Sequence, residues 1–169
     1  LRFDVDSLEY RVIVEWIAAG QQNPSDADAR LQKLEILPAA SQQKKGASQQ
    51  LVVRGHFSDG HVEDVTRWCK FTSANATVAS VYERGLASII GFGEGAINAW
   101  YLSQNAIATV SSPFETPVDA AVFANSDRSS FVDDQVLAKL KSLNIPPSPR
   151  CSDSEFLRRA FLDTIGVLP

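Results

Sequence analysis

The sequence predicts a mainly β fold, a sandwich or a barrel, flanked by short α-helical segments. About eight short runs in residues 31–112 alternate polar and apolar side chains, which is the period of a half-buried strand. Turn-forming residues separate these runs at short intervals, as they do in all-β domains. Apolar residues at helical spacing occur near the two ends of the chain.

Residues 8–17 are the first predicted element, a helix with one apolar face. We expect Asp6 to be its N-cap, because Glu9 follows three residues later, and Gly20 to end it. Residues 21–30 are polar and aperiodic, so they are predicted to be a linker. The apolar face consists of Leu8, Val12, Trp16 and Ile17.

The strand pattern begins at Leu31. Ser58–His61 contains an Asp-Gly pair typical of a tight hairpin, and it joins the second predicted strand to Val62–Thr66. In the first two strands the residues expected to face the core are Leu34, Ile36, Leu51, Val53 and Phe57. The later runs are Trp68–Ser73, Thr77–Val81, Gly85–Ile90, Ala96–Ser103 and Ala106–Ser112.

The stretch GFGEG, residues 91–95, places three glycines at alternate positions. A P-loop would need a Gly-Lys-Ser/Thr ending and a following helix, whereas this stretch contains Glu94 and precedes a strand pattern. The spacing of the glycines also differs from that of a dinucleotide-binding motif. We therefore expect them to allow the backbone angles of a tight turn between two strands.

Helical patterns return after residue 113. A turn or two of helix is predicted in Thr116–Asn125, and a longer helix in Ser129–Asn144. Ser152 and Glu155 form a capping-box pattern ahead of a last helix. The apolar stripe expected for the longer helix is Val132, Val136, Leu140 and Leu143, and its dipole is complemented by Asp133, Asp134, Lys139 and Lys141.

The stretch KFTSANATVASVYERGLASIIGFGEGAINAWY resembles the bacterial immunoglobulin-like group 2 family. The matching features are an aromatic residue at Phe71, the Val-Ala-x-Val pattern at 78–81, the turn glycine Gly85, and the pair Gly93 and Gly95 before the last hairpin. Residues 34–53 are similar to the opening strands of such a module. The resemblance covers about half of the chain and implies an Ig-like β-sandwich flanked by short α-helical segments.

The two flanks resemble other domains of large planctomycete-type envelope or secreted proteins. Residues 10–20 are similar to the closing helix of a cytochrome c-like domain, and residues 146–169 to the start of a domain of unknown function. The haem-attachment motif Cys-x-x-Cys-His is absent from this chain, so the resemblance implies no cofactor here. We expect the chain to be the middle of a longer, extracytoplasmic protein.

These resemblances imply four parts: the end of a preceding domain plus linker in 1–30, the sandwich in 31–112, a linker in 113–128, and the start of a helical domain in 129–169. The expected role is a non-catalytic spacer or interaction module, with the flanking domains, or a protein or glycan at the cell surface, as partners. One alternative is an adhesion or carbohydrate-binding module. Another is an accessory part of a haem-bearing redox or hydrolytic enzyme.

Titratable residues give little support for a catalytic or metal site, and we predict neither. His56 and His61 flank the Asp-Gly turn near Asp59, but Arg54 shares the predicted face of His56, so a solvated hairpin is expected. Adjacent acids at helix starts usually face water rather than converge on a substrate. The acidic pairs are Asp133 with Asp134, and Asp153 with Glu155.

Three aromatic residues form the candidate interaction surface: Trp68, Trp100 and Tyr101. If Ile97, Ala99 and Tyr101 share one sheet face, then Trp100 lies on the other face. An exposed aromatic side chain could pack against a neighbouring domain, which we expect, or stack on a sugar.

Composition narrows the partners further. The net charge of −4 and pI near 5.1 argue against nucleic-acid binding, and no apolar run reaches the roughly 20 residues of a membrane helix. Cys69 and Cys151 lie in different predicted parts, so we expect free buried thiols rather than a disulfide.

Overall fold

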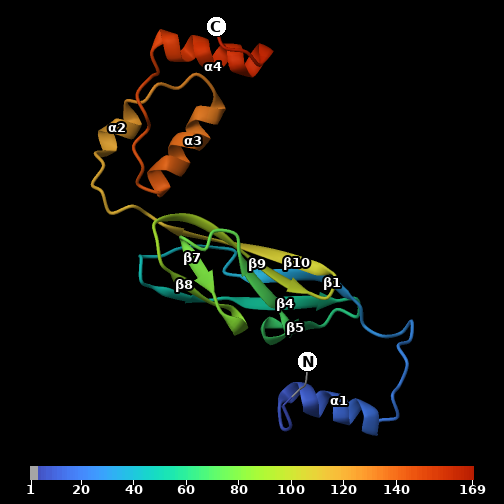
Figure 1. Ribbon diagram of the computed structural model, residues 1–169. Helices are drawn as coiled ribbons and strands as arrows, with labels where there is room; N and C mark the ends of the chain where they lie inside the picture. Colours follow the sequence, from blue (N-terminus) through green and yellow to red (C-terminus); the bar gives the residue numbers. More distant parts are fainter. Residues whose placement is uncertain (1–3) are drawn as a thin grey trace.

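The computed structural model describes residues 4–169 as a β-sandwich with a helix before it and three helices after it (Figure 1). The mainly β class predicted from the sequence is confirmed. The strands are β1 Leu31–Leu37, β2 Ala40–Gln42, β3 Ser48–Gln50, β4 Val52–Phe57, β5 Val62–Asp64, β6 Lys70–Ser73, β7 Ala79–Val81, β8 Leu86–Ile89, β9 Gly93–Tyr101 and β10 Gln104–Ser112. The helices are α1 Leu8–Ala18, α2 Ala120–Ala124, α3 Phe131–Ser142 and α4 Asp153–Ile165, with 3-10 turns η1 Thr66–Trp68 and η2 Glu83–Gly85.

The strands form three small sheets, in the orders β1-β4-β5, β2-β10-β9-β6 and β3-β8-β7. Every neighbouring pair is antiparallel except β2 and β10, which run parallel. All three sheets contribute to one apolar core, to which β4, β8 and β9 supply the fully buried Val53, Ile89 and Ile97. One core of this kind makes the central part a single packing unit.

Alternation predicted four of the five inward residues correctly; Phe57 is only partly buried, and its ring stacks on His61 in the hairpin. Leu34 and Ile36 are buried in β1, as are Leu51 and Val53 before and in β4, because side chains at every second position share a face. The predicted hairpin joins β4 to β5, where the Phe57 N–H donates to the His61 carbonyl at 3.0 Å.

The GFGEG stretch contains a bend followed by a strand. Gly91 lies in the bend between β8 and β9, and a Cβ there would come within 2.2 Å of the Thr77 carbonyl oxygen. Gly93 adopts a φ of +114°, which L side chains rarely occupy. The expected turn is therefore present, but β9 starts at Gly93, three residues earlier than the pattern indicates.

Residues 40–50 contain two strands that the period-2 pattern does not show. β2 and β3 are three residues long, and their side chains are mainly Ser and Gln. β2 pairs with β10, and β3 pairs with β8. Strands this short are held by main-chain bonds to partners far away in the sequence, so local alternation does not identify them.

The N-cap of helix α1 lies one residue later than predicted. Ser7 is the N-cap and accepts a hydrogen bond from the Tyr10 N–H at 3.1 Å, while Asp6 adopts a φ of +79° and does not cap the helix. Ser and Asp are similarly good caps, so sequence alone does not separate them. No residue of α1 is buried.

The C-terminal helices confirm the capping prediction and correct the apolar stripe. Ser152 and Glu155 form the expected capping box of α4. The predicted stripe is only half right: Leu143 is buried and Leu140 partly buried, but Val132 and Val136 are about half exposed. Leu137, outside the predicted stripe, is buried beside Phe123 of α2.

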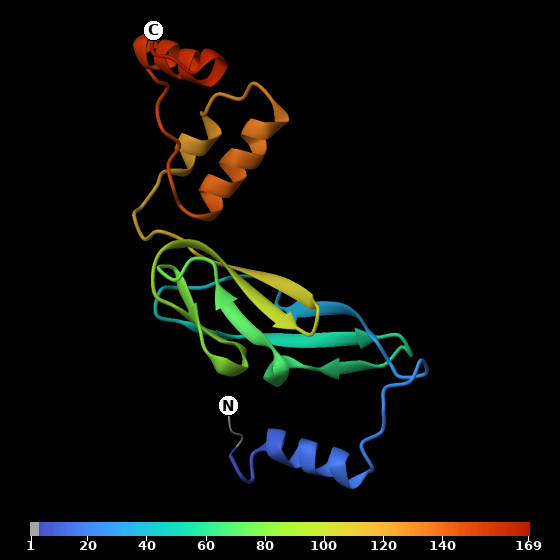
Figure 2. The ribbon, with the colours of Figure 1, turned by 45° about the vertical axis from the view of Figure 1, so that its right-hand side comes forward.

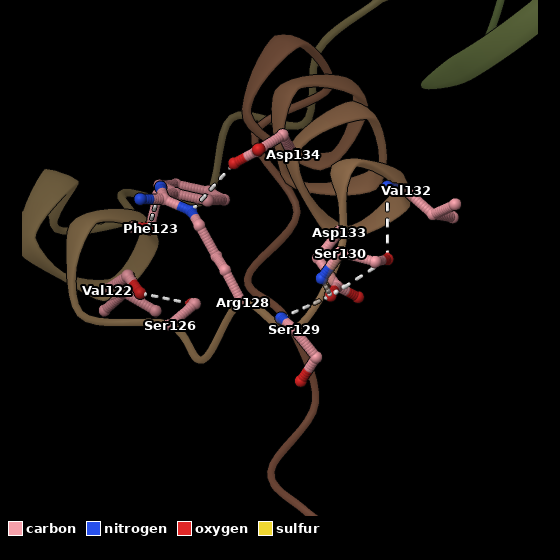
Figure 3. Close-up of polar contacts among 9 residues, drawn as sticks. All are labelled: Val122, Phe123, Ser126, Arg128, Ser129, Ser130, Val132, Asp133 and Asp134. Atoms are coloured by element: carbon pink, nitrogen blue, oxygen red, sulfur yellow. Dashed lines mark hydrogen bonds and ion pairs between the residues drawn. The ribbon is translucent and has the colours of Figure 1, made fainter.

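A small cluster of polar contacts joins α2 to α3 (Figure 3). The Arg128 guanidinium donates to the Phe123 carbonyl at 3.2 Å and pairs with Asp134 at 3.2 Å. The two elements therefore pack as one unit around Phe123 and Leu137, which are both buried.

The cysteines are both free, as predicted, but they are not both buried. Cys69 is partly buried, and Cys151 is exposed in the segment before α4. The predicted burial of Cys151 is therefore wrong, because residues 148–159 around it are all exposed.

None of the helices in residues 4–169 has the length and apolarity needed to cross a membrane.

Candidate interaction surfaces

The outer face of the four-stranded sheet carries an exposed tryptophan. Trp100 is 48% exposed, while Ile97 and Ala99 on the same strand are fully buried. Across the sheet, Trp100 pairs with Lys70 of β6 and Asn105 of β10. We call the outward residues Lys70, Asn98, Trp100, Asn105 and Ile107 the Trp100 surface.

The Trp100 surface combines an apolar centre with hydrogen-bonding groups. Ile107 is 54% exposed and lies diagonal to Trp100, since Asn105 is opposite Trp100 and strand neighbours two residues apart share a face. Lys70 and the two asparagines supply donors and acceptors around the indole. In such an arrangement the indole can stack on a flat aromatic ring or sugar, while the polar side chains around it hydrogen-bond to the polar groups at the edge of that ligand.

The other two predicted aromatics lie elsewhere. Tyr101 packs against the core, and burial raises the pKa of its hydroxyl, with smaller contributions from the charges of Glu63 and Cys69. Trp68 is 41% exposed in η1, before β6, and among the described residues no ring pairing joins it to Trp100. Whether any of the three binds a partner stays a prediction.

The two histidine rings lie beside different carboxylates. His61 Nδ1 lies 2.5 Å from Asp59 Oδ1, and its ring stacks on Phe57 at 4.3 Å. His56 Nε2 lies 3.4 Å from Glu35 Oε2 on the neighbouring strand. In residues 4–169 no group of three or more His, Cys, Asp or Glu side chains is arranged to hold a metal.

The two acidic residues in the first turn of α3 make local contacts. Asp133 Oδ2 accepts from the N–H groups of Ser129 and Ser130 at 2.7 and 2.8 Å, and these bonds lower its pKa (Figure 3). Asp134 is directed to Arg128. The two carboxylates therefore bind different groups and do not converge on a substrate position.

A polar cleft of about 460 Å³ lies between α1 and the sandwich. Glu9 of α1 pairs there with Arg67 at 3.2 Å. Cys69 also lines the cleft, but its Sγ donates to the Val65 carbonyl, and burial, with the nearby charge of Asp64, raises its pKa to about 11. The thiol is therefore protonated near neutral pH and is a weak nucleophile.

The C-terminal end of α3 is bound to the sandwich by polar contacts from two strands. Gln42 of β2 donates to the Ser142 carbonyl at 2.7 Å, and Glu94 of β9 pairs with Lys139. The Glu94 of GFGEG thus faces a helix that lies 45 residues further along the chain. Its neighbour Phe92 packs against Phe114, with ring centroids 5.5 Å apart.

The segment after β10 is fastened to the same helix end. The Phe114 N–H donates to the Leu143 carbonyl at 3.0 Å, and Asn144 Nδ2 lies 2.7 and 2.6 Å from the carbonyls of Phe114 and Thr116. Asn144 has a φ of +57°, and the N–H groups of Asn144 and Ile145 bond back to Lys141 and Leu140, which is a Schellman cap. We call the contacts of Gln42, Glu94, Phe114, Lys139 and Asn144 the α3 junction.

Sequence reasoning missed the junction and the cleft. Asn144 after a helical pattern is a known C-cap signal, and it was available in the sequence. Its side-chain partners in 113–116, and the partners of Glu94 and Gln42, depend on how the chain folds back, which no local pattern shows.

Part of the chain is similar in sequence to a known protein. No known protein-family model matches the chain. Ice-binding protein 1 of Shewanella frigidimarina is 40% identical over 72 residues, which are 43% of this chain and 8% of that protein. The chain therefore spans less than a tenth of the length of this relative.

Solved structures of the S-layer protein SbsC are similar at low sequence identity. Domains 4 and 5 of SbsC match with 16% identity and a TM-score of 0.44, over 50% of this chain and 53% of that one. The larger fragment rSbsC(31–844) matches with 16% identity and a TM-score of 0.46, over 54% of this chain and 14% of that one.

Proposed function

We propose that the chain contains a non-catalytic Ig-like spacer and interaction module, which holds flanking domains of a large exported bacterial protein at a set geometry. The α3 junction carries this proposal, because it binds the following helical unit to two strands of the sandwich and to the segment leaving β10. A flexible tether would need no such contacts.

The sequence comparisons support an extracytoplasmic setting. The resemblance of residues 34–53 and 70–101 to bacterial Ig-like group 2 modules, a family whose model does not match the chain, implies a surface or secreted parent. The 72-residue similarity to an ice-binding protein fits the same setting, although that protein is far longer than this chain. We also propose that a cytochrome c-like domain precedes this module in the parent protein and that a domain of unknown function follows it.

A distance measurement at rest tests the spacer role. Spin labels at Asp59→Cys on the hairpin and Gln135→Cys on α3, in a Cys151→Ser background, report the sandwich-to-helix distance, since Cys69 is poorly reactive. We expect one narrow distance distribution, because the junction fixes α3. A broad distribution in the unmodified junction would contradict the proposal.

The same labels test whether the junction causes the order. The triple variant Gln42→Ala, Glu94→Gln and Asn144→Gly removes the side-chain hydrogen bonds of Gln42 and Asn144 and the negative charge that pairs with Lys139, and Gly accepts the positive φ of Asn144. We expect this variant to broaden the distribution. A matched control is Gln22→Ala, Glu15→Gln and Asn23→Gly, which lie before the sandwich and should leave the distribution narrow.

A second candidate function, glycan binding, is favoured by one observation, the half-exposed Trp100 among Lys70, Asn98 and Asn105. A glycan array probed with the full chain tests it. Binding that Trp100→Ala removes and Trp68→Ala leaves unchanged would support it. If no glycan binds, or if both variants bind like the unmodified chain, this candidate is rejected.

A further inference from the structure

The chain enters and leaves the sandwich at opposite ends. Both views show the linker from α1 meeting β1 at one end, and β10 leading into the C-terminal helices at the other (Figures 1 and 2). β1 and β2 follow each other in the sequence, and β2 runs parallel to β10. A pull on the two flanking parts would therefore act along the strands.

The pairing of β2 with β10 lies directly in the path of such a pull. Ala40–Gln42 are in register with Thr109–Ser111. The Thr109 N–H donates to the Ala39 carbonyl at 2.9 Å, and the Gln43 N–H donates to the Ser111 carbonyl at 2.8 Å. These bonds connect the first strands of the sandwich to the last one.

Because β2 and β10 run parallel, a pull on the two ends of the chain strains all the hydrogen bonds between them at once. In a parallel pair the pulled ends, the start of β2 and the finish of β10, lie at opposite ends of the pair. The strands must then slide past each other, so that all their bonds are strained together. In an antiparallel pair pulled from one end, the bonds break one after another.

The α3 junction adds a weaker, outer connection. Phe114 and Asn144 are joined by hydrogen bonds, so the residues between them form a closed loop that contains α2 and α3. Tension arriving from α4 reaches Asn144 first and passes through these bonds to Phe114 and β10. The bonds are few and exposed, whereas the sandwich pairs enclose a buried core.

We propose that this chain is a mechanical link that resists tension in two stages: the α3 junction opens at low force and releases the loop between Phe114 and Asn144, while the sandwich, sheared through β2 and β10, holds to a higher force. This goes beyond the spacer role, because a spacer needs only a set shape at rest. The load would be tension between the flanking parts of the same protein.

Single-molecule force spectroscopy on the full chain, pulled from its two ends, tests the proposal. Opening the junction and unravelling α2 and α3, which bury only Phe123 and Leu137 between them, frees about 30 residues, or about 100 Å of extended chain, and unfolding residues 31–112 frees about 80 residues, or about 280 Å. We expect the shorter step at the lower force. One combined step, or the longer step first, would overturn the two-stage order.

Asn144→Gly identifies the first step, because it removes both side-chain bonds to 113–116 and keeps the left-handed backbone. We expect the force of the short step to fall by half or more, with the long step unchanged. Asn23→Gly in the N-terminal linker is the control and should change neither step. A short step unaffected by Asn144→Gly would overturn its assignment to the junction.

Changing the direction of pulling tests the shear stage without altering the core. A handle at Asp59→Cys, in a Cys151→Ser background, and one at the N-terminus pull Leu31 away from its partner Phe57, and Arg30 from Ser58. These pairs peel open one at a time, so we expect at least a twofold lower force than between the chain ends. Equal forces in the two directions would overturn the proposal, and the distance measurement at rest would still judge the spacer role separately.

Discussion

The three glycines of GFGEG should respond to alanine in a fixed order, since each meets a different constraint. At Gly91 the new Cβ would come within 2.2 Å of the Thr77 carbonyl oxygen, which is backbone and cannot rotate away. Overpacking of this kind costs about 3 kcal/mol, the upper end of the usual range. At Gly93 the φ of +114° strains any L side chain, which costs about 2 kcal/mol.

Gly95 is the control within the same stretch. Its Cβ would lie 3.5 Å from the Asn75 carbonyl oxygen, an ordinary contact, and its φ is not positive. Because glycine weakens a strand interior, Gly95→Ala should lie within about 0.5 kcal/mol of the unmodified chain or be slightly more stable.

Urea unfolding followed by far-UV circular dichroism measures this order. With a slope of about 1 kcal/mol per molar urea, Gly91→Ala should shift the midpoint by about 3 M, Gly93→Ala by about 2 M and Gly95→Ala by less than 0.5 M. If Gly95→Ala destabilises the chain as much as Gly91→Ala, the close approach to Thr77 does not explain the glycine.

Three other measurements check separate parts of the structure. Hydrogen bonds from Thr66 lower the pKa of Asp64 in the folded chain. The stabilisation from Asp64 is therefore present above the unfolded pKa near 4 and is lost as the pH falls through the folded value. Asp64→Asn should reduce the loss of urea stability between pH 7 and pH 3, and an unchanged loss would contradict this. Iodoacetamide at pH 8 should label Cys151 and spare Cys69 until urea is added, as mass spectrometry will show, and early labelling of Cys69 would contradict its raised pKa. Amide hydrogen exchange should be faster in α1 and α4, which bury no residue, than in β9 and β10, and strong protection of those helices in a proven monomer would refute this.

Local rules predicted what depends on neighbours in the sequence. The alternation of β9 put Ile97 and Trp100 on opposite faces of the sheet, as the structure has them, and the Asp-Gly pair placed the hairpin between β4 and β5. The capping box at Ser152 and Glu155 was likewise visible, because its two partners are three residues apart.

Contacts between distant segments could not be predicted in this way. The apolar stripe of α3 is covered at Leu140 and Leu143 but exposed at Val132 and Val136, while Leu137 is buried beside α2, so the pattern alone did not show which side is buried. The pairing of β2 with β10 and the approach of Glu94 to Lys139 join residues that are far apart in the sequence. The Trp100 surface was partly predictable, since its centre follows from alternation but its neighbours follow from strand order.

The α3 junction relies on few side-chain identities. Gln42 and Asn144 donate to main-chain carbonyls of Ser142, Phe114 and Thr116, and the Phe114 N–H bonds to another carbonyl. Any residue presents a carbonyl, so mutation at most of these positions leaves the acceptors in place. During divergence, the helical unit can therefore change most of its sequence and keep its position on the sandwich, provided that the side chains of Gln42, Glu94, Lys139 and Asn144 are conserved.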